Sequence, residues 1–180
     1  VLHMGTVLAV VFYFGRKIIN LLKKYFWFLL IGTIPAGLVG FFFRDQIELL
    51  FGNIKVVGFT LLITALLNFA TDRKIEGKKN INGKKALLIG IAQALAIIPG
   101  ISRSGATIFS GVVSGIDKEK TAEFSFLLSL PAILGANILQ IFSHGSDSGV
   151  DYSFYILGFL AAFISGFISI QLVLKTLHRK

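Results

Sequence analysis

A short run of hydroxyl and basic side chains interrupts an apolar stretch near the middle of the chain. Residues 99–107 read PGISRSGAT. Arg103 carries a permanent positive charge on a planar group whose fork matches phosphate oxygens. Three hydroxyl groups flank it, those of Ser102, Ser104 and Thr107. These residue types, so closely spaced, predict a loop that binds a phosphate group.

The Pro-Gly pair predicts that a helix begins directly after it, and a helix start suits an anion. Its first N–H groups have no partner within the helix, and the helix dipole adds about half a positive charge there. Thr107 lies three residues after Ser104, so both hydroxyls can face one side. Small residues let a ligand approach the backbone. We therefore predict Arg103 and Ser102 as catalytic residues, and Ser104, Gly105, Thr107 and Gly100 as substrate-binding residues.

A simpler interpretation gives this loop no chemistry. Ser102 would only cap a helix, and Arg103 would extend its charge to the membrane surface. However, no charged residue lies between Lys85 and Arg103, or between Arg103 and Asp117. A charge placed so far from an interface is unfavourable by at least ~2.5 kcal/mol on insertion scales, which favours a functional role for Arg103.

The elements that must position this loop are membrane helices. The chain has 180 residues, of which 54% are hydrophobic and 15% charged, and its mean hydropathy is +0.79. The apolar residues form blocks of the length that crosses a bilayer, about 20 residues. We expect five crossings, the first one partial, over 1–14, 25–43, 54–70, 124–142 and 152–174. The predicted fold class is an all-α polytopic membrane helix bundle, as a single domain over 1–180.

The charges between the spans predict the orientation and the path of residues 86–115. Lys and Arg gather in alternate loops, at 16–24, 73–85 and 175–180, so these loops are expected in the cytoplasm. A single crossing by 86–115 would move the last basic group outside. Each half, on either side of Pro99-Gly100, spans about 21 Å as a helix against ~30 Å of hydrocarbon. We therefore predict a re-entrant broken-helix hairpin, as in half of an inverted-repeat architecture.

Composition excludes some classes of partner and site. The net charge is +9, but basic residues beside apolar spans are typical of membrane orientation signals, and we expect no nucleic acid partner. The chain contains no cysteine, which excludes disulfides and thiolate metal sites.

Residues 92–108, AQALAIIPGISRSGATI, resemble the second signature of the undecaprenyl-diphosphate phosphatases, also called bacitracin-resistance proteins. Residues 123–132, EFSFLLSLPA, are similar to the stretch that follows it, and residues 1–6, VLHMGT, to the family's first full span. The resemblance implies a membrane phosphatase that removes the terminal phosphate of undecaprenyl diphosphate. Its product is the lipid carrier of cell-wall synthesis, and its activity confers bacitracin resistance. It also implies the bacterial plasma (inner) membrane, a multi-pass topology and a divalent metal, Mg or Ca.

The family's first signature is a Glu-rich stretch followed by Pro-x-Ser-Ser-Thr-Gly-His, and we expect it before Val1. We also expect a last helix after Lys180. On this expectation the 180 residues alone are inactive, and the metal ligands are unknown. The nucleophile, water or a serine, stays open.

Other functions stay open at the level of the residues. A transporter or flippase for a phosphorylated lipid or anion would share the inverted-repeat architecture. A non-catalytic remnant is a third alternative. The bilayer is an expected partner in each case, and a homo-oligomer is a further alternative.

Overall fold

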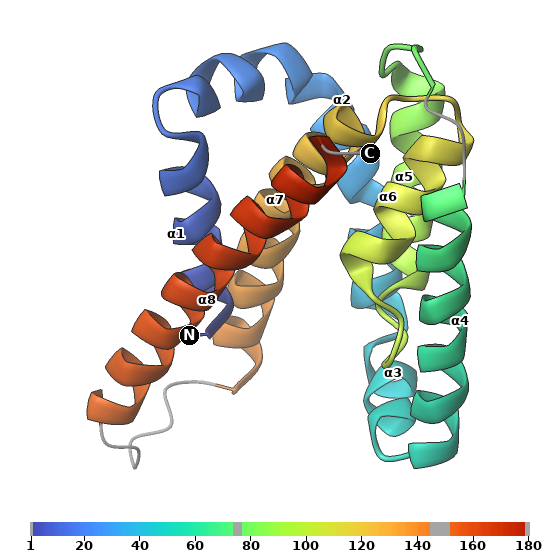
Figure 1. Cartoon of the computed structure of the whole chain (residues 1–180). Coiled ribbons are helices and arrows are strands. Elements are labelled where there is room, and N and C mark those ends of the chain that lie inside the picture. Colours follow the sequence, from blue (N-terminus) through green and yellow to red (C-terminus); the bar gives the residue numbers. More distant parts are fainter. Residues whose placement is uncertain (1, 74–76, 145–151, 179–180) are drawn as a thin grey trace. The chain divides into compact units, whose positions relative to one another are not determined.

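A computed structural model describes residues 2–73, 77–144 and 152–178, and within these ranges most of the chain is helical (Figure 1). The prediction of an all-α membrane bundle is confirmed. The described helices are α1 (Leu2–Phe14), α2 (Lys17–Phe42), α3 (Arg44–Phe51), α4 (Ile54–Arg73), α5 (Gly83–Leu95), α6 (Arg103–Val113), α7 (Lys118–His144) and α8 (Tyr152–His178).

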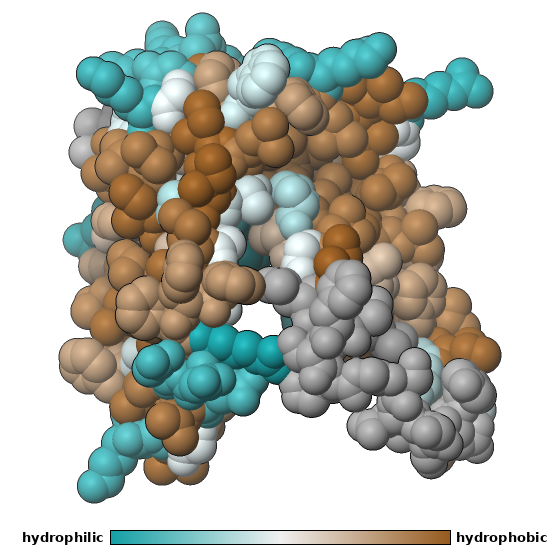
Figure 2. Space-filling view, turned by 180° about the vertical axis from the view of Figure 1, so that it is seen from behind, coloured by the Kyte–Doolittle hydropathy of each residue, from teal (hydrophilic) through white to brown (hydrophobic). Residues whose placement is uncertain are grey.

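Four helices, α2, α4, α7 and α8, are long and apolar enough to cross a membrane. They correspond to the four complete spans expected from the sequence, except that α2 ends at Phe42, one residue before the expected end. The partial span expected at 1–14 corresponds to α1, an apolar helix of 13 residues. Figure 2 shows hydrophobic side chains over most of the visible helix surfaces, with hydrophilic ones gathered toward the helix ends. This distribution suits contact with lipid along the helices and with water at their ends.

One helix lies where the sequence suggested only a connection between two spans. α3 is a helix of eight residues, none of them buried. Its first turn carries Asp45, whose charge favours a helix start. An ion pair between Arg44 Nε and Glu48 Oε1, 3.1 Å apart, joins positions i and i+4.

The chain divides into two compact units, residues 1–24 with 129–180, and residues 25–128. In the first unit α1 packs along α8. Gly5 permits this approach, because a Cβ atom there would lie 2.5 Å from Phe159 O. The rings of Phe12 and Phe163 meet edge to face with centroids 5.5 Å apart.

The second unit contains the predicted phosphate-binding loop. Here α6 packs against both α4 and α5 (Figure 1). A Cβ atom on Gly90 of α5 would lie 2.5 Å from Gly32 O of α2, and one on Gly111 of α6 would lie 2.3 Å from the Thr121 side chain of α7. Small residues therefore bring these helices close together, as is common in membrane helix packing.

The apolar core of this unit lies among the same helices. Its largest fully buried apolar side chains are Ile89, Val112, Ile116, Phe124, Leu127 and Leu128. The Tyr25 ring packs on Phe124 with centroids 5.6 Å apart. This packing holds α5 and α6 together on either side of the loop.

Candidate active site

The loop between α5 and α6 follows the break predicted from Pro99-Gly100. After α5 ends at Leu95, the backbone continues in tight turns. Ile97 N–H donates to Ala94 O and Ile98 N–H donates to Leu95 O, both at 3.2 Å. The chain then reverses, and α6 begins at Arg103. The two helices have 13 and 11 residues, or about 20 Å and 17 Å of length, which is shorter than the ~30 Å of bilayer hydrocarbon. The broken-helix hairpin is thus present.

Gly100 has a positive φ of 90° and lies against α4. A Cβ atom there would lie 2.1 Å from Thr60 Oγ1 and 2.7 Å from Val57 O, and real Cβ atoms do not approach so closely. The conformation and the packing both require glycine at this position. Gly100 therefore allows the loop to pack closely on α4. Substrate binding by Gly100 stays a prediction.

Two threonines of α4 hold the loop, and the sequence reasoning missed both. Thr60 Oγ1 contacts Pro99 O across the helices. Thr64 Oγ1 donates to Gly100 O at 2.8 Å and accepts a hydrogen bond from Ser102 N–H at 2.9 Å. The available signal was their spacing, because Thr60, Thr64 and Asn68 recur every fourth residue in an otherwise apolar span.

Ser102 caps α6. Its Oγ accepts a hydrogen bond from Gly105 N–H at 3.2 Å, its carbonyl accepts from Ala106 N–H at 2.9 Å, and its Oγ lies 3.4 Å from Ser104 Oγ. The cap proposed by the simpler interpretation is therefore real. The first backbone N–H groups of a helix have no partner within the helix. The cap at Ser102 bonds to only one of those of α6, that of Gly105. Among the described residues, no hydrogen bond is formed by the N–H groups of Arg103 and Ser104.

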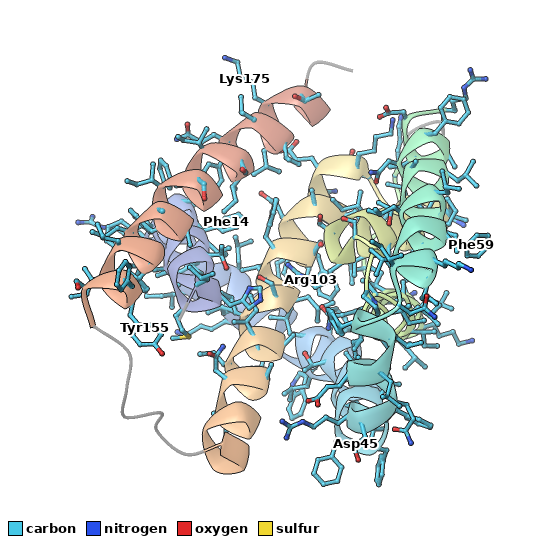
Figure 3. The ribbon with its side chains drawn as sticks, turned by 90° about the horizontal axis from the view of Figure 1, so that it is seen from below. Phe14, Asp45, Phe59, Arg103, Tyr155 and Lys175 are labelled. Atoms are coloured by element: carbon cyan, nitrogen blue, oxygen red, sulfur yellow. The ribbon has the colours of Figure 1, made fainter. Side chains whose placement is uncertain are left out.

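The Arg103 side chain is half-buried and runs toward α7. Its Nη1 donates to Ser125 O at 3.3 Å, and Figure 3 labels it beside the ribbon of that helix. This contact uses one of five guanidinium donors. Within residues 2–73, 77–144 and 152–178, Arg103 forms no ion pair. The remaining donors can therefore bind an anion close to the start of α6.

Thr107 and Gly105 are both more enclosed than the sequence suggested. Thr107 has no exposed surface, and its Oγ1 lies 2.6 Å from Ser125 Oγ and 2.8 Å from Arg103 O. It joins α6 to α7, and a substrate contact by Thr107 stays a prediction. Gly105 faces α4, since a Cβ atom there would lie 2.8 Å from Asn68 Oδ1. Ser125 and Asn68 are further residues at the site that the sequence reasoning did not single out.

Gln93 on α5 is only 2% exposed. In the part of the chain that the structure describes, neither its Oε1 nor its Nε2 forms a hydrogen bond. A buried amide without partners is unfavourable by about 1–3 kcal/mol. Its presence within the hairpin makes it a residue to test by substitution.

The donors around the loop do not fit a divalent metal. They are an arginine, serine and threonine hydroxyls and backbone groups, whereas Mg²⁺ and Ca²⁺ prefer carboxylates together with neutral oxygen ligands. Across the described ranges no three His, Asp or Glu side chains gather as a metal site. The described loop is suited to an anion.

Comparisons with known proteins show the family to which the sequence is similar. Residues 1–180 match a family described as bacitracin resistance protein BacA. A relative named undecaprenyl-diphosphatase from Methanosphaera stadtmanae is 36% identical over 97% of this chain and 74% of its own. One of the same name from Methanothermobacter thermautotrophicus is 44% identical over 84% of this chain and 87% of its own. A third relative of this name, from Thermosipho africanus, is 40% identical over 98% of this chain and 73% of its own.

Proposed function

The chain belongs to the bacitracin resistance protein BacA family, and from this membership we propose that it is an undecaprenyl-diphosphate phosphatase. It removes the terminal phosphate of undecaprenyl diphosphate, regenerates the lipid carrier of cell-wall synthesis and so confers bacitracin resistance. The names of its relatives favour this activity over a transporter or flippase.

The observation that carries the proposal is the start of α6. Two N–H groups, on Arg103 and Ser104, point from the first turn without a partner among the described residues, and the positive end of the helix dipole lies with them. Arg103 belongs to the same turn, and its guanidinium extends to Ser125 O of α7. Phosphoryl transfer depends mostly on positioning and on stabilising charge at the phosphate oxygens, and this turn supplies both.

Each loop residue then has a defined task. Arg103 neutralises the diphosphate with the guanidinium donors that do not bind Ser125 O. Because Ser102 Oγ accepts from Gly105 N–H, its proton is left to donate to Ser104 or to a phosphate oxygen. Ser104 Oγ lies beside it and supplies a further donor. Gly105, with no side chain, lets the first turn of α6 lie against Asn68 of α4, and substrate binding by Gly105 is proposed through its backbone alone.

A divalent metal, Mg or Ca, is expected from the family resemblance. It would offset the repulsion between the phosphates and the glutamates of the family's first signature. The described residues do not form its ligand set, and no step of the chemistry proposed here is assigned to it.

The membrane surrounds the prenyl chain of the substrate. Many large apolar side chains of the spans are exposed, such as Phe59, Leu62 and Leu66 of α4. A prenyl chain has the same solubility as lipid tails, so the substrate can reach the loop from within the bilayer. We place the protein in the plasma (inner) membrane of its cell, with assembly as a homo-oligomer as an additional proposal.

Phosphate release tests the function directly. The protein expressed from its complete gene is purified in detergent and given undecaprenyl diphosphate with Mg²⁺ or Ca²⁺. We expect free phosphate and undecaprenyl phosphate in equal amounts. Absence of phosphate release, together with movement of the intact diphosphate across vesicle membranes, would replace the phosphatase with the transporter.

A further inference from the structure

The backbone of the loop reverses direction inside the helix packing, where its polar groups need partners. Pro99 O, Gly100 O and Ser102 N–H belong to neither helix ladder, because α5 ends at Leu95 and α6 begins at Arg103. In a membrane an unpaired backbone group finds no water and is strongly unfavourable. Something outside the hairpin must therefore satisfy them.

α4 supplies these partners through side chains one turn apart. Thr60 contacts Pro99 O, and Thr64 is bonded to Gly100 O and to Ser102 N–H. Thr64 uses its hydroxyl as donor and as acceptor at once, at 2.8 Å and 2.9 Å. A single atom thus fixes the backbone on both sides of Ile101.

This use of a helical threonine differs from that of others in the chain. Thr71 of α4 donates to Leu67 O, and Thr33 of α2 donates to Leu29 O, each four residues back in its own helix. That local bond is the ordinary one for a buried helical threonine. Among the bonds of the described residues, those of Thr64 go only to the loop.

The position of Ser102 decides where the start of α6 points. Ser102 is the N-cap, and the free N–H groups of Arg103 and Ser104 follow it directly. A shift of Ser102 N–H away from Thr64 would rotate these donors relative to the bound phosphate. Donors stabilise a transition state only if they are already aimed at the position that the charge will occupy.

We propose that Thr64 is a positioning residue of this enzyme, whose hydroxyl holds Gly100 and Ser102 so that the first N–H groups of α6 face the substrate's phosphate. This proposal rests on the proposed function. Thr60 supports the preceding residue, and Asn68, one turn further along α4, lies against Gly105 in the same first turn. The polar side of α4 is therefore a second wall of the active site.

The test exchanges the hydroxyl of Thr64 for a methyl group of the same size. In the protein expressed from its complete gene, Thr64→Val is expected to lower kcat by about 10–100-fold, somewhat less than the loss of a direct donor, with KM within about threefold of the original. Thr64→Ser keeps the hydroxyl and is expected to stay within about threefold. The matched control is Thr71→Val, which removes only a bond within α4 and is expected to leave kcat unchanged.

A second readout is independent of activity. Hydrogen–deuterium exchange at the Ser102 amide, resolved by fragmentation mass spectrometry, is expected to accelerate about 3–10-fold in Thr64→Val and not in Thr64→Ser or Thr71→Val. A Thr64→Val protein with the original kcat would overturn the proposal, as would Thr64→Ser as impaired as Thr64→Val. If the unmodified protein releases no phosphate, the proposed function fails. The exchange rates then decide the positioning role alone, and an unchanged rate in Thr64→Val rejects it.

Discussion

Gly100→Ala tests the packing of the loop between α5 and α6 on α4. The new Cβ atom would lie 2.1 Å from Thr60 Oγ1 and 2.7 Å from Val57 O, at a φ of 90°. The positive φ alone is unfavourable by about 1–2 kcal/mol for alanine. Moving the loop away from Val57 O breaks the bonds to Thr60 and Thr64, each worth about 1 kcal/mol. We expect a loss of about 3–4 kcal/mol in total, which is the sum of the strain and of one bond to each threonine.

The assay is the melting temperature of the purified protein in detergent, with phosphate release measured in parallel. Gly58→Ala is the control, since it lies in α4 and a Cβ atom there meets nothing within 4 Å. Alanine favours a helix over glycine by about 1 kcal/mol, so the control is expected to melt at the same temperature or higher. If Gly100→Ala melted like the unmodified protein and kept its activity, the described packing of the loop on α4 would be refuted.

Three further predictions concern other parts of the protein. Thr107→Val removes the bond to Ser125 Oγ from a fully buried site and is expected to lower stability by about 1–3 kcal/mol, as measured by the melting temperature; an unchanged value would show that the pair contributes nothing. Gln93→Leu removes a buried amide that has no partner among the described residues and is expected to maintain or raise the melting temperature; loss of phosphate release at equal stability would instead place Gln93 at the substrate. The loop charges predict that Asn53→Cys is labelled from outside the cell by a reagent that cannot cross membranes and that Lys78→Cys is not; the reverse result would invert the topology.

The sequence was sufficient to predict the hairpin because its signals are local. Pro99 and Gly100 interrupt a long apolar block, and each remaining half is too short to cross a bilayer. The cap at Ser102 was likewise readable from residue type and position. α3 was missed because a helix of eight residues with mixed polarity resembles an ordinary connection.

The contacts around the loop could not be predicted in the same way. Thr64 and Thr71 look alike in the sequence, and both lie on α4, yet one bonds to the loop and the other to its own helix. The difference arises from the register at which α4 packs on α6, which no local pattern encodes. Thr107 was predicted from its spacing to Ser104, and no local pattern could show that its hydroxyl also lies against Ser125 of α7.

In the proposed function Arg103 binds the phosphate of the substrate, and substitution of Arg103 tests this role most directly. In the protein expressed from its complete gene, Arg103→Ala is expected to lower phosphate release from undecaprenyl diphosphate at least about 10²–10³-fold at equal abundance in the membrane. Arg103→Lys is expected to recover little, because a point charge lacks the planar fork that holds two phosphate oxygens. An Arg103→Lys protein with near-normal activity per molecule, or an Arg103→Ala protein that lost abundance but kept its activity, would contradict the phosphate-binding role.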